Sequence, residues 1–240
     1  MSDLENLLVE SSKKINISLS ENQIDQFMQY KKMLLEWNEK VNLTAITDEK
    51  EIILKHFVDC LAISLGVDLN GDKRIIDVGT GAGFPGIPIK IAFPQIKITL
   101  LDSLNKRILF LKELVEDIGL ENVECIHARA EDAGADKTMR EGFDFCISRA
   151  VANLAVLSEY CIPFVRVGGS FISMKGPEVA EELISAKKAI GILGGEVIDV
   201  KEVNIPETDI MHSLILIKKV KPTPTKYPRK AGKVKKEPIV

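Results

Sequence analysis

A strand followed at once by a glycine-rich loop is the feature that most constrains this chain of 240 residues. The apolar run Ile75–Val78, interrupted by Asp77, predicts a buried strand, and glycine occupies every second position of the loop Gly79–Gly83. Pro85 and Pro88 come where a helix would begin, and proline is tolerated in the first turn of a helix. Strand, glycine loop and helix in this order open a nucleotide-binding βαβ unit, in which glycine lets a ligand approach the backbone.

The loop satisfies two sequence templates. The G-x-G-x-x-G template of dinucleotide-binding proteins is matched by Gly81, Gly83 and Gly86. The G-x-G-x-G template of S-adenosylmethionine (SAM) enzymes is matched by the loop Gly79–Gly83. A pyrophosphate needs N–H groups at a helix N-terminus, and Pro85 lacks one. Because SAM has no phosphate and carries a positive charge, which the nearby Asp77 suits, the chemistry favours SAM, although a plain tight turn has the same spacing.

The composition is that of an ordinary globular protein, with 45% hydrophobic and 28% charged residues. No apolar run approaches the roughly 20 residues needed to cross a bilayer, and the acidic residues near the N-terminus are atypical of a signal peptide. The four cysteines and three histidines show no metal-ligand spacing. We therefore expect a cytoplasmic protein that binds neither a metal nor a membrane.

The charge is unevenly distributed along the chain. The net charge is −3, which by itself argues against a nucleic-acid partner. Residues 221–240, called the basic tail below, nevertheless carry seven lysine and arginine residues and a single glutamate. Such an asymmetry is typical of an arm that binds a polyanion, and a solvated, unstructured segment is the alternative. The proline-rich composition predicts an extended tail without a core of its own.

The first 70 residues predict only helices. Ser20 and Gln23 form a capping box before apolar residues of helical period, and Asp48 with Glu51 begins a further helix that ends near Gly66. This helical region could be a lid, a substrate-recognition module or simple packing, and the sequence leaves these alternatives open.

From Lys73 onward, predicted strands alternate with predicted helices, except that no helix separates the last two strands. After the first strand, further strands are predicted at Lys97–Asp102, Val123–His127, Phe143–Ser148, Ser170–Met174, Glu196–Val203 and Met211–Val220. Repeated βα units predict a parallel sheet, and the two final strands without an intervening helix imply one antiparallel edge strand. The expected class is α/β, a Rossmann-like SAM-dependent methyltransferase sheet. We expect a helical extension at 1–70, the SAM-binding domain at 71–220 and the basic tail at 221–240.

Two acidic residues come directly after predicted strands. Asp102 lies about 20 residues past the glycine loop, where a carboxylate can accept hydrogen bonds from both ribose hydroxyls, in NAD and SAM alike. Glu131 follows the third strand, where an acid could bond an adenine amino group or simply cap a helix.

Further motifs accompany the glycine loop along nearly the whole chain. They are Trp37-Asn38, Asn42-Leu43-Thr44, His56 with Asp59, Leu101-Asp102-Ser103, Arg129-Ala130-Glu131, Ser148-Arg149-Ala150-Val151, Lys175-Gly176 and Tyr227 to Gly232. Together these motifs resemble those of the bacterial small-subunit rRNA guanine-N7 methyltransferases, the RsmG or GidB family. The chain departs from the family pattern at Cys60, where a serine is expected, and at Val234, where a proline is expected.

The resemblance implies an enzyme that uses SAM to methylate N7 of a guanine in 16S rRNA, either as RNA or in a precursor of the small ribosomal subunit, and that acts as a monomer. It implies SAM contacts at Gly79, Phe84, Ala130, Glu131 and Arg149. Asp102 matches the ribose-binding acid of the wider fold, and Gly81 belongs to the same glycine template. Arg149 and the basic tail are candidates for RNA contacts.

Methylation at N7 needs neither a general base nor a covalent nucleophile, because N7 has a lone pair and no proton; catalysis is then mainly positioning. In agreement, the chain lacks the Asp/Asn-Pro-Pro-Tyr/Phe motif of amino-group methyltransferases, and Cys146 lies inside a strand pattern. Three alternatives stay open: a methyltransferase acting on a small molecule or protein, a protein that binds SAM or RNA without chemistry, and an NAD-dependent oxidoreductase.

Overall fold

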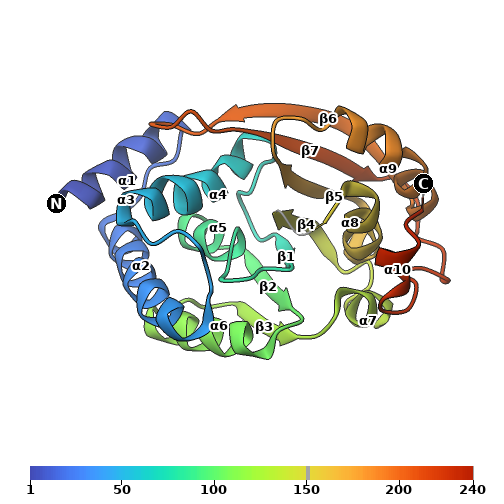
Figure 1. Ribbon diagram of the computed structural model, residues 1–240, viewed down its shortest axis with the longest axis horizontal. Coiled ribbons are helices and arrows are strands. Elements are labelled where there is room, and N and C mark those ends of the chain that lie inside the picture. Colours follow the sequence, from blue (N-terminus) through green and yellow to red (C-terminus); the bar gives the residue numbers. More distant parts are fainter. Residues whose placement is uncertain (150–151, 240) are drawn as a thin grey trace.

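The computed structural model describes residues 1–149 and 152–239 of the chain. In this described part the centre is a seven-stranded sheet with the order β3-β2-β1-β4-β5-β7-β6 (Figure 1). The strands are Arg74–Val78 (β1), Lys97–Asp102 (β2), Val123–His127 (β3), Phe143–Arg149 (β4), Val165–Lys175 (β5), Gly195–Asn204 (β6) and Met211–Lys219 (β7). Ala150 and Val151, the end of the motif that follows β4, lie outside the described residues.

The predicted fold class is confirmed, but the antiparallel strand expected at the edge of the sheet lies one place inside it. Neighbouring strands from β3 through β5 pair in parallel, whereas β7 is antiparallel to both β5 and β6. The antiparallel strand is thus inserted between β5 and β6, and β6 forms the edge (Figure 1). Burial explains this order: β7 is buried along most of its length, whereas most residues of β6 are exposed.

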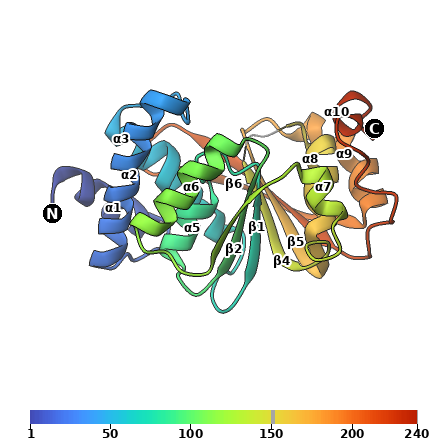
Figure 2. The same cartoon turned by 90° about the horizontal axis from the view of Figure 1, so that it is seen from below.

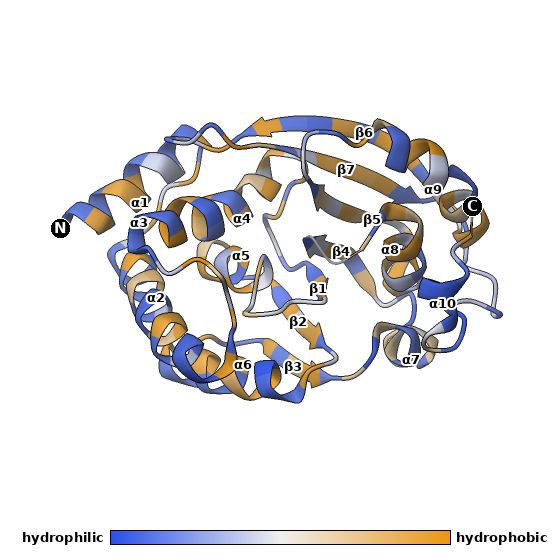
Figure 3. Cartoon of the chain, viewed as in Figure 1, coloured by the Kyte–Doolittle hydropathy of each residue, from blue (hydrophilic) through white to orange (hydrophobic). Residues whose placement is uncertain are grey.

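Helices cover both faces of the sheet, as Figure 2 shows. The helices α5 (Gly86–Ala92) and α6 (Asn105–Asp117) share one hydrophobic core with the N-terminal helices. The opposite face packs against α7 (Ala130–Ala135), α8 (Leu154–Cys161) and α9 (Ala180–Leu193), with η3 (Ile162–Phe164) leading into β5. Hydrophobic residues run along β2, β5 and β7 in Figure 3, between these two layers. The carboxyl ends of the parallel strands therefore meet at one edge, between two packed helical layers.

The N-terminal helices are built into the core of the sheet. They are α1 (Asp3–Lys14), α2 (Glu21–Val41), α3 (Glu49–Ile52), the π-helical turn η1 (Ile53–Val58), α4 (Asp59–Leu61) and η2 (Ala62–Leu65). The predicted capping box of Ser20 and Gln23 is confirmed, and the Asp48 side chain accepts a hydrogen bond from the Glu51 backbone N–H, as expected for the cap of α3. Leu8, Phe27 and Phe57 are buried in the same cluster as Ile87 and Phe110. Helix α2 packs on α5 and α6, α4 packs on α5, and α1 packs on α2, α3 and η1.

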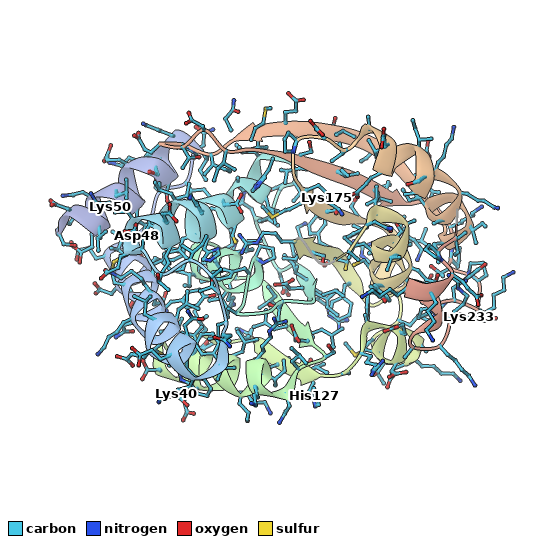
Figure 4. The ribbon with its side chains drawn as sticks, in the orientation of Figure 1. Lys40, Asp48, Lys50, His127, Lys175 and Lys233 are labelled. Carbon is cyan, nitrogen blue, oxygen red and sulfur yellow. The ribbon has the colours of Figure 1, made fainter. Side chains whose placement is uncertain are left out.

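The basic tail lies against the body of the protein and ends in the short helix α10 (Lys233–Lys236). Arg140 donates hydrogen bonds to the backbone carbonyls of Thr223 and Tyr227, both at 2.7 Å, and Lys219 donates to the Thr223 hydroxyl at 2.7 Å. Lys233, labelled in Figure 4, marks this segment at the periphery of the molecule. Within the described residues, no helix is both long enough and apolar enough to cross a bilayer.

Candidate functional site

The glycine loop folds back over the end of β1. Gly79, Gly81 and Gly83 all have positive φ, and a Cβ at Gly83 would come within 2.8 Å of Ile87 and 2.9 Å of Leu111. A Cβ at Gly86 would lie 2.5 Å from Leu100 and 2.8 Å from the Asp77 carboxylate. The glycine that completes the dinucleotide template is therefore required by packing inside the protein.

Asp77 lies beneath this loop and holds it together. Its Oδ2 accepts hydrogen bonds from the Thr80 hydroxyl at 2.7 Å and from the Gly86 backbone N–H at 2.8 Å. Its Oδ1 is buried and has no partner among the described residues. Burial raises the pKa of Asp77 to about 7, and the hydrogen bonds from Thr80 and Gly86 oppose this shift. Asp77 thus shapes the loop from below.

This buried carboxyl gives a testable pH dependence. Because its pKa is raised in the folded state, folded protein holds the proton to higher pH than unfolded chain does, and the free energy of unfolding falls as pH rises from about 4 to about 7. We expect the Asp77→Asn variant to lack this fall. Urea unfolding of both proteins across that pH range measures it, and parallel pH profiles would show that Asp77 is not the responsible group.

The end of β2 presents Asp102 to the glycine loop. One carboxylate oxygen accepts the Gly81 N–H and the other the Leu104 N–H, both at 2.9 Å, and Arg107 lies 3.3 Å from the first oxygen. Oδ2 thus accepts from both Gly81 and Arg107, whereas Oδ1 accepts only from Leu104 and retains further acceptor capacity. Asp102 thereby fixes the loop and still faces the space above it.

The end of β3 meets the basic tail. Ala130 and Glu131 begin α7, and the Glu131 carboxylate accepts a hydrogen bond from the Gly232 N–H at 3.4 Å. Tyr160 of α8 and Lys235 of α10 complete this side. The tail therefore forms part of the wall opposite the glycine loop, which local sequence patterns do not indicate.

Arg149, the last residue of β4, is held by groups from two other parts of the chain. Its Nη1 donates to the Asp59 carboxylate at 2.9 Å, and its Nη2 lies 3.2 Å from Nδ1 of His56. Asp59 is also 2.6 Å from Nδ1 of His212 on β7. The guanidinium carbon lies 4.9 Å from the ring centre of Phe84, on which the His56 imidazole also stacks. These contacts fix Arg149 in one orientation.

One cavity of about 780 Å³ connects these elements at the carboxyl ends of β1, β2 and β4. Its lining includes every residue predicted to contact the cofactor: Gly79, Gly81, Phe84, Asp102, Ala130, Glu131 and Arg149. The lining also includes residues for which the sequence predicted no contact with the cofactor, namely Leu43, Thr44, His56, Arg107, Tyr160, Gly232 and Lys235. Thr44, His56 and Gly232 belong to the motifs shared with the methyltransferase family, and this membership was the sequence feature that could have indicated their place in the site. Among residues 1–149 and 152–239, no cluster of His, Cys, Asp or Glu is placed to hold a metal ion.

The N-terminal region contributes to this cavity directly and indirectly. The buried hydroxyl of Tyr30, on α2, donates a hydrogen bond of 2.6 Å to the Ala82 carbonyl in the glycine loop. Tyr30 stacks on Phe57 and on Phe84, with ring centres 5.1 and 5.5 Å apart. The helices before the sheet thus support the loop from behind.

The inserted antiparallel strand and the glycine loop that opens onto a cavity at the strand ends define the class as Rossmann-like methyltransferases. M. jannaschii TYW2 in complex with AdoMet superposes with a TM-score of 0.51 at 18% identity, covering 63% of this chain and 71% of that one. Aeropyrum pernix fibrillarin with natively bound S-adenosyl-L-methionine superposes with a TM-score of 0.50 at 18% identity, covering 63% and 68%. At this level of identity, the two structures show the fold.

Sequence similarity extends much further with one family. The family model described as rRNA small subunit methyltransferase G (GidB) matches residues 23–211. The chain is 54% identical, over 237 residues and 99% of both chains, to the ribosomal RNA small subunit methyltransferase G of Alkaliphilus oremlandii (strain OhILAs). The chain belongs to the rRNA small subunit methyltransferase G family, and the predicted family and enzyme class are confirmed.

Proposed function

We propose that this protein transfers a methyl group from SAM to N7 of a guanine in 16S rRNA, as RNA or in a precursor of the small ribosomal subunit. The observation that carries the proposal is that all seven predicted contact residues surround one cavity. Support comes from the relative of Alkaliphilus oremlandii, which is named for this class of substrate. A cytoplasmic location and a monomeric state are part of the proposal.

The residues of the cavity fit SAM in size and chemistry. A volume of about 780 Å³ is within the range of about 300–1,000 Å³ typical of small-molecule sites. Asp102 and Glu131 offer carboxylates to the hydroxyl and amino groups of an adenosine, and the loop Gly79–Gly83 offers its backbone to the atoms between. Arg149 would hold the remaining end, because β4 lies on the side of β1 away from β2 and β3.

In this reaction the main task of the protein is to position the methyl group and the guanine relative to each other. When bound, SAM supplies an electrophilic methyl group on a positively charged sulfur. Guanine N7 needs no deprotonation, and the imidazole in the wall is not arranged as a base: burial, followed by the charge of Arg149, lowers the pKa of His56 to about 4. Both His56 nitrogens already contact Arg149 and Thr44. Cys146 is fully buried within β4, which argues against a covalent route.

The target guanine should be unpaired, because N7 faces the major groove, which is deep and narrow in A-form RNA. The basic tail beside the cavity supplies exposed cations for the RNA backbone, namely Lys221, Lys226, Lys230, Lys235 and Lys236. Arg229 is a weaker candidate for an RNA contact, because it is paired with Glu159 at 2.6 Å.

The proposal is tested by incubating the protein with methyl-labelled SAM and either 16S rRNA or small ribosomal subunits. We expect label on a guanine at N7, with 23S rRNA as a control that stays unlabelled. Comparison of the two substrates shows which form is methylated. Label on another atom, or SAM binding without transfer to either substrate, would contradict the proposal.

A further inference from the structure

Thr44 belongs to the cavity wall and is held there by three other residues. It lies in the segment between α2 and α3, where its backbone N–H donates to Oδ1 of Asn38 at 2.9 Å. Its hydroxyl oxygen lies 2.8 Å from Nε2 of His56, and the backbone N–H of Ile46 donates to the same oxygen at 3.0 Å. The position of the Thr44 oxygen is therefore fixed.

Arg149 determines the direction of the hydrogen bond between His56 and Thr44. A guanidinium only donates, so the contact of 3.2 Å between Nη2 of Arg149 and Nδ1 of His56 makes Nδ1 the acceptor. The imidazole is neutral at physiological pH, because burial and the charge of Arg149 lower the pKa of His56 to about 4. Its one proton is therefore on Nε2, which donates to the Thr44 oxygen.

The Thr44 hydroxyl can consequently act only as a donor toward a ligand. A hydroxyl oxygen has two acceptor positions, and His56 and Ile46 occupy both of them. Within the part of the chain that the structure describes, Thr44 makes no hydrogen bond that would use the hydroxyl proton. A ligand group beside Thr44 must therefore be an acceptor, whereas an amino group in that place would oppose one donor to another.

Thr44 lies on the side of the cavity that the cofactor leaves for the base. The acids that suit adenosine follow β2 and β3, and Arg149, which suits the methionine end of SAM, ends β4, so the sulfur between them lies above the glycine loop. Thr44 is next to this loop, since the His56 ring to which it is bonded stacks on Phe84, with ring centres 4.4 Å apart. Leu43 adds an apolar surface to the same wall, against which a flat base can pack. We therefore expect a base presented to the methyl group to lie against Thr44.

The other side-chain donors of the cavity lining are engaged or lie elsewhere. The Thr80 hydroxyl donates to Asp77 at 2.7 Å, and Arg149 is assigned to the methionine end of the cofactor. The remaining donors lie beside the acids proposed to bind adenosine, namely Ser103, Arg107, Arg129, Tyr160 and Lys235. Among the described residues of the lining, Thr44 is thus the side-chain donor left for the base.

Guanine and adenine differ at the group next to N7. Both bases present N7 as an acceptor, but guanine has O6, a second acceptor, where adenine has the N6 amino group, a donor. We propose that the Thr44 hydroxyl donates a hydrogen bond to O6 of the target guanine and thereby selects guanine over adenine. His56 is a positioning residue, because its N–H occupies the Thr44 oxygen and leaves the hydroxyl only the role of donor. This inference rests on the proposed function and deepens it.

Replacement of the target guanine by 2-aminopurine isolates this contact, because 2-aminopurine keeps N7 and the 2-amino group but lacks O6. The base is introduced at the methylated position of 16S rRNA by ligation of RNA fragments, and the RNA is used alone or in reconstituted small subunits. We expect the ratio of the methylation rates of the guanine and the 2-aminopurine substrates to be roughly tenfold lower in Thr44→Val than in wild-type protein, as for loss of one hydrogen bond. Any difference in the intrinsic reactivity of the two bases is common to both proteins and cancels between the two ratios.

Two further variants test the roles of the hydroxyl and of the imidazole. Thr44→Ser restores the hydroxyl and should restore the wild-type ratio. His56→Phe keeps a ring beside Phe84 but removes the N–H that donates to Thr44, so its ratio should fall as well. Calorimetry with S-adenosylhomocysteine separates this role from cofactor binding, because Thr44→Val should bind that ligand as wild-type protein does.

Thr208→Val is the matched control. Like Thr44, Thr208 accepts a hydrogen bond from the N–H two residues later, at 3.1 Å from Ile210, but it lies outside the cavity lining. This variant should methylate both substrates at the wild-type rates. An unchanged ratio in Thr44→Val, or a lower rate that weaker binding of S-adenosylhomocysteine fully explains, would overturn the inference while leaving the proposed function intact. Failure of wild-type protein to methylate the guanine substrate would contradict the proposed function itself.

Discussion

We expect the Arg149→Met variant to lose methyl transfer by roughly 100-fold or more, because a reaction that depends on positioning is sensitive to small displacements of the bound reactants. Arg149 is fixed by Asp59 and His56 and lies against Phe84, so it supports both the cavity wall and the end of the cavity at β4. Its loss should also weaken S-adenosylhomocysteine binding. Initial rates with 16S rRNA or small subunits, together with calorimetry, measure the two effects.

The same variant should be less stable than wild-type protein. Asp59 is buried, and without Arg149 its charge would retain only the contact with His212, at 2.6 Å. Removing one partner of a buried ion pair typically costs about 3–5 kcal/mol. The double variant Asp59→Asn/Arg149→Met removes the unpaired charge and should regain part of this stability without regaining activity. Methyl transfer by Arg149→Met within tenfold of wild type would show that Arg149 is only structural.

Local chemistry made the centre of the site predictable. Three of the five residues of the strand Arg74–Val78 are apolar, and the glycines after it have positive φ, so strand and loop follow from a short stretch of sequence. Asp102 was found in the same way, because parallel strands bring their carboxyl ends to one edge of the sheet. Its hydrogen bond to Gly81 shows that the acid also shapes the loop, a role that the ribose interpretation did not include.

The order of the last two strands could have been predicted from their amino-acid patterns, although the prediction of an antiparallel edge strand did not use them. In β7 the run Ser213–Ile217 is buried on both sides, which is typical of a central strand. In β6 polar and exposed residues prevail, as is usual for an edge strand that must avoid pairing with other molecules. The sequence difference between these strands therefore contains the information that β7 is inserted.

The rest of the cavity depends on contacts between distant residues. Thr44 and His56 reach Arg149 across about 100 residues, through a π-helical turn that no apolar periodicity reveals. Gly232 and Lys235 reach the cavity only because the basic tail folds back along the body. Composition predicted an extended tail, and it could not show which buried groups anchor it.

The ion pair between Arg229 and Glu159 holds the basic tail on the body of the protein, and its loss should have a large effect on stability. We expect Arg229→Ala to lower the free energy of unfolding by about 3 kcal/mol, because it leaves the Glu159 carboxylate buried without its cation. Glu159 is fully buried, and Arg229 binds both of its oxygens, through Nε at 2.9 and 3.1 Å and through Nη2 at 2.6 Å. For a protein of this size, that change lowers the melting temperature by several degrees. Chemical and thermal unfolding measure it.

Detachment of the basic tail should also weaken binding at the cofactor site. Gly232 and Lys235 lie only a few residues beyond Arg229 and form part of the cavity wall, so Arg229→Ala should bind S-adenosylhomocysteine more weakly and be cleaved more readily by proteases within residues 221–239. Lys230→Ala removes an exposed charge at the next position and should stay within about 0.5 kcal/mol of wild type. If the two variants had the same stability and the same affinity, the Arg229–Glu159 pair would not be what holds the tail over the cavity.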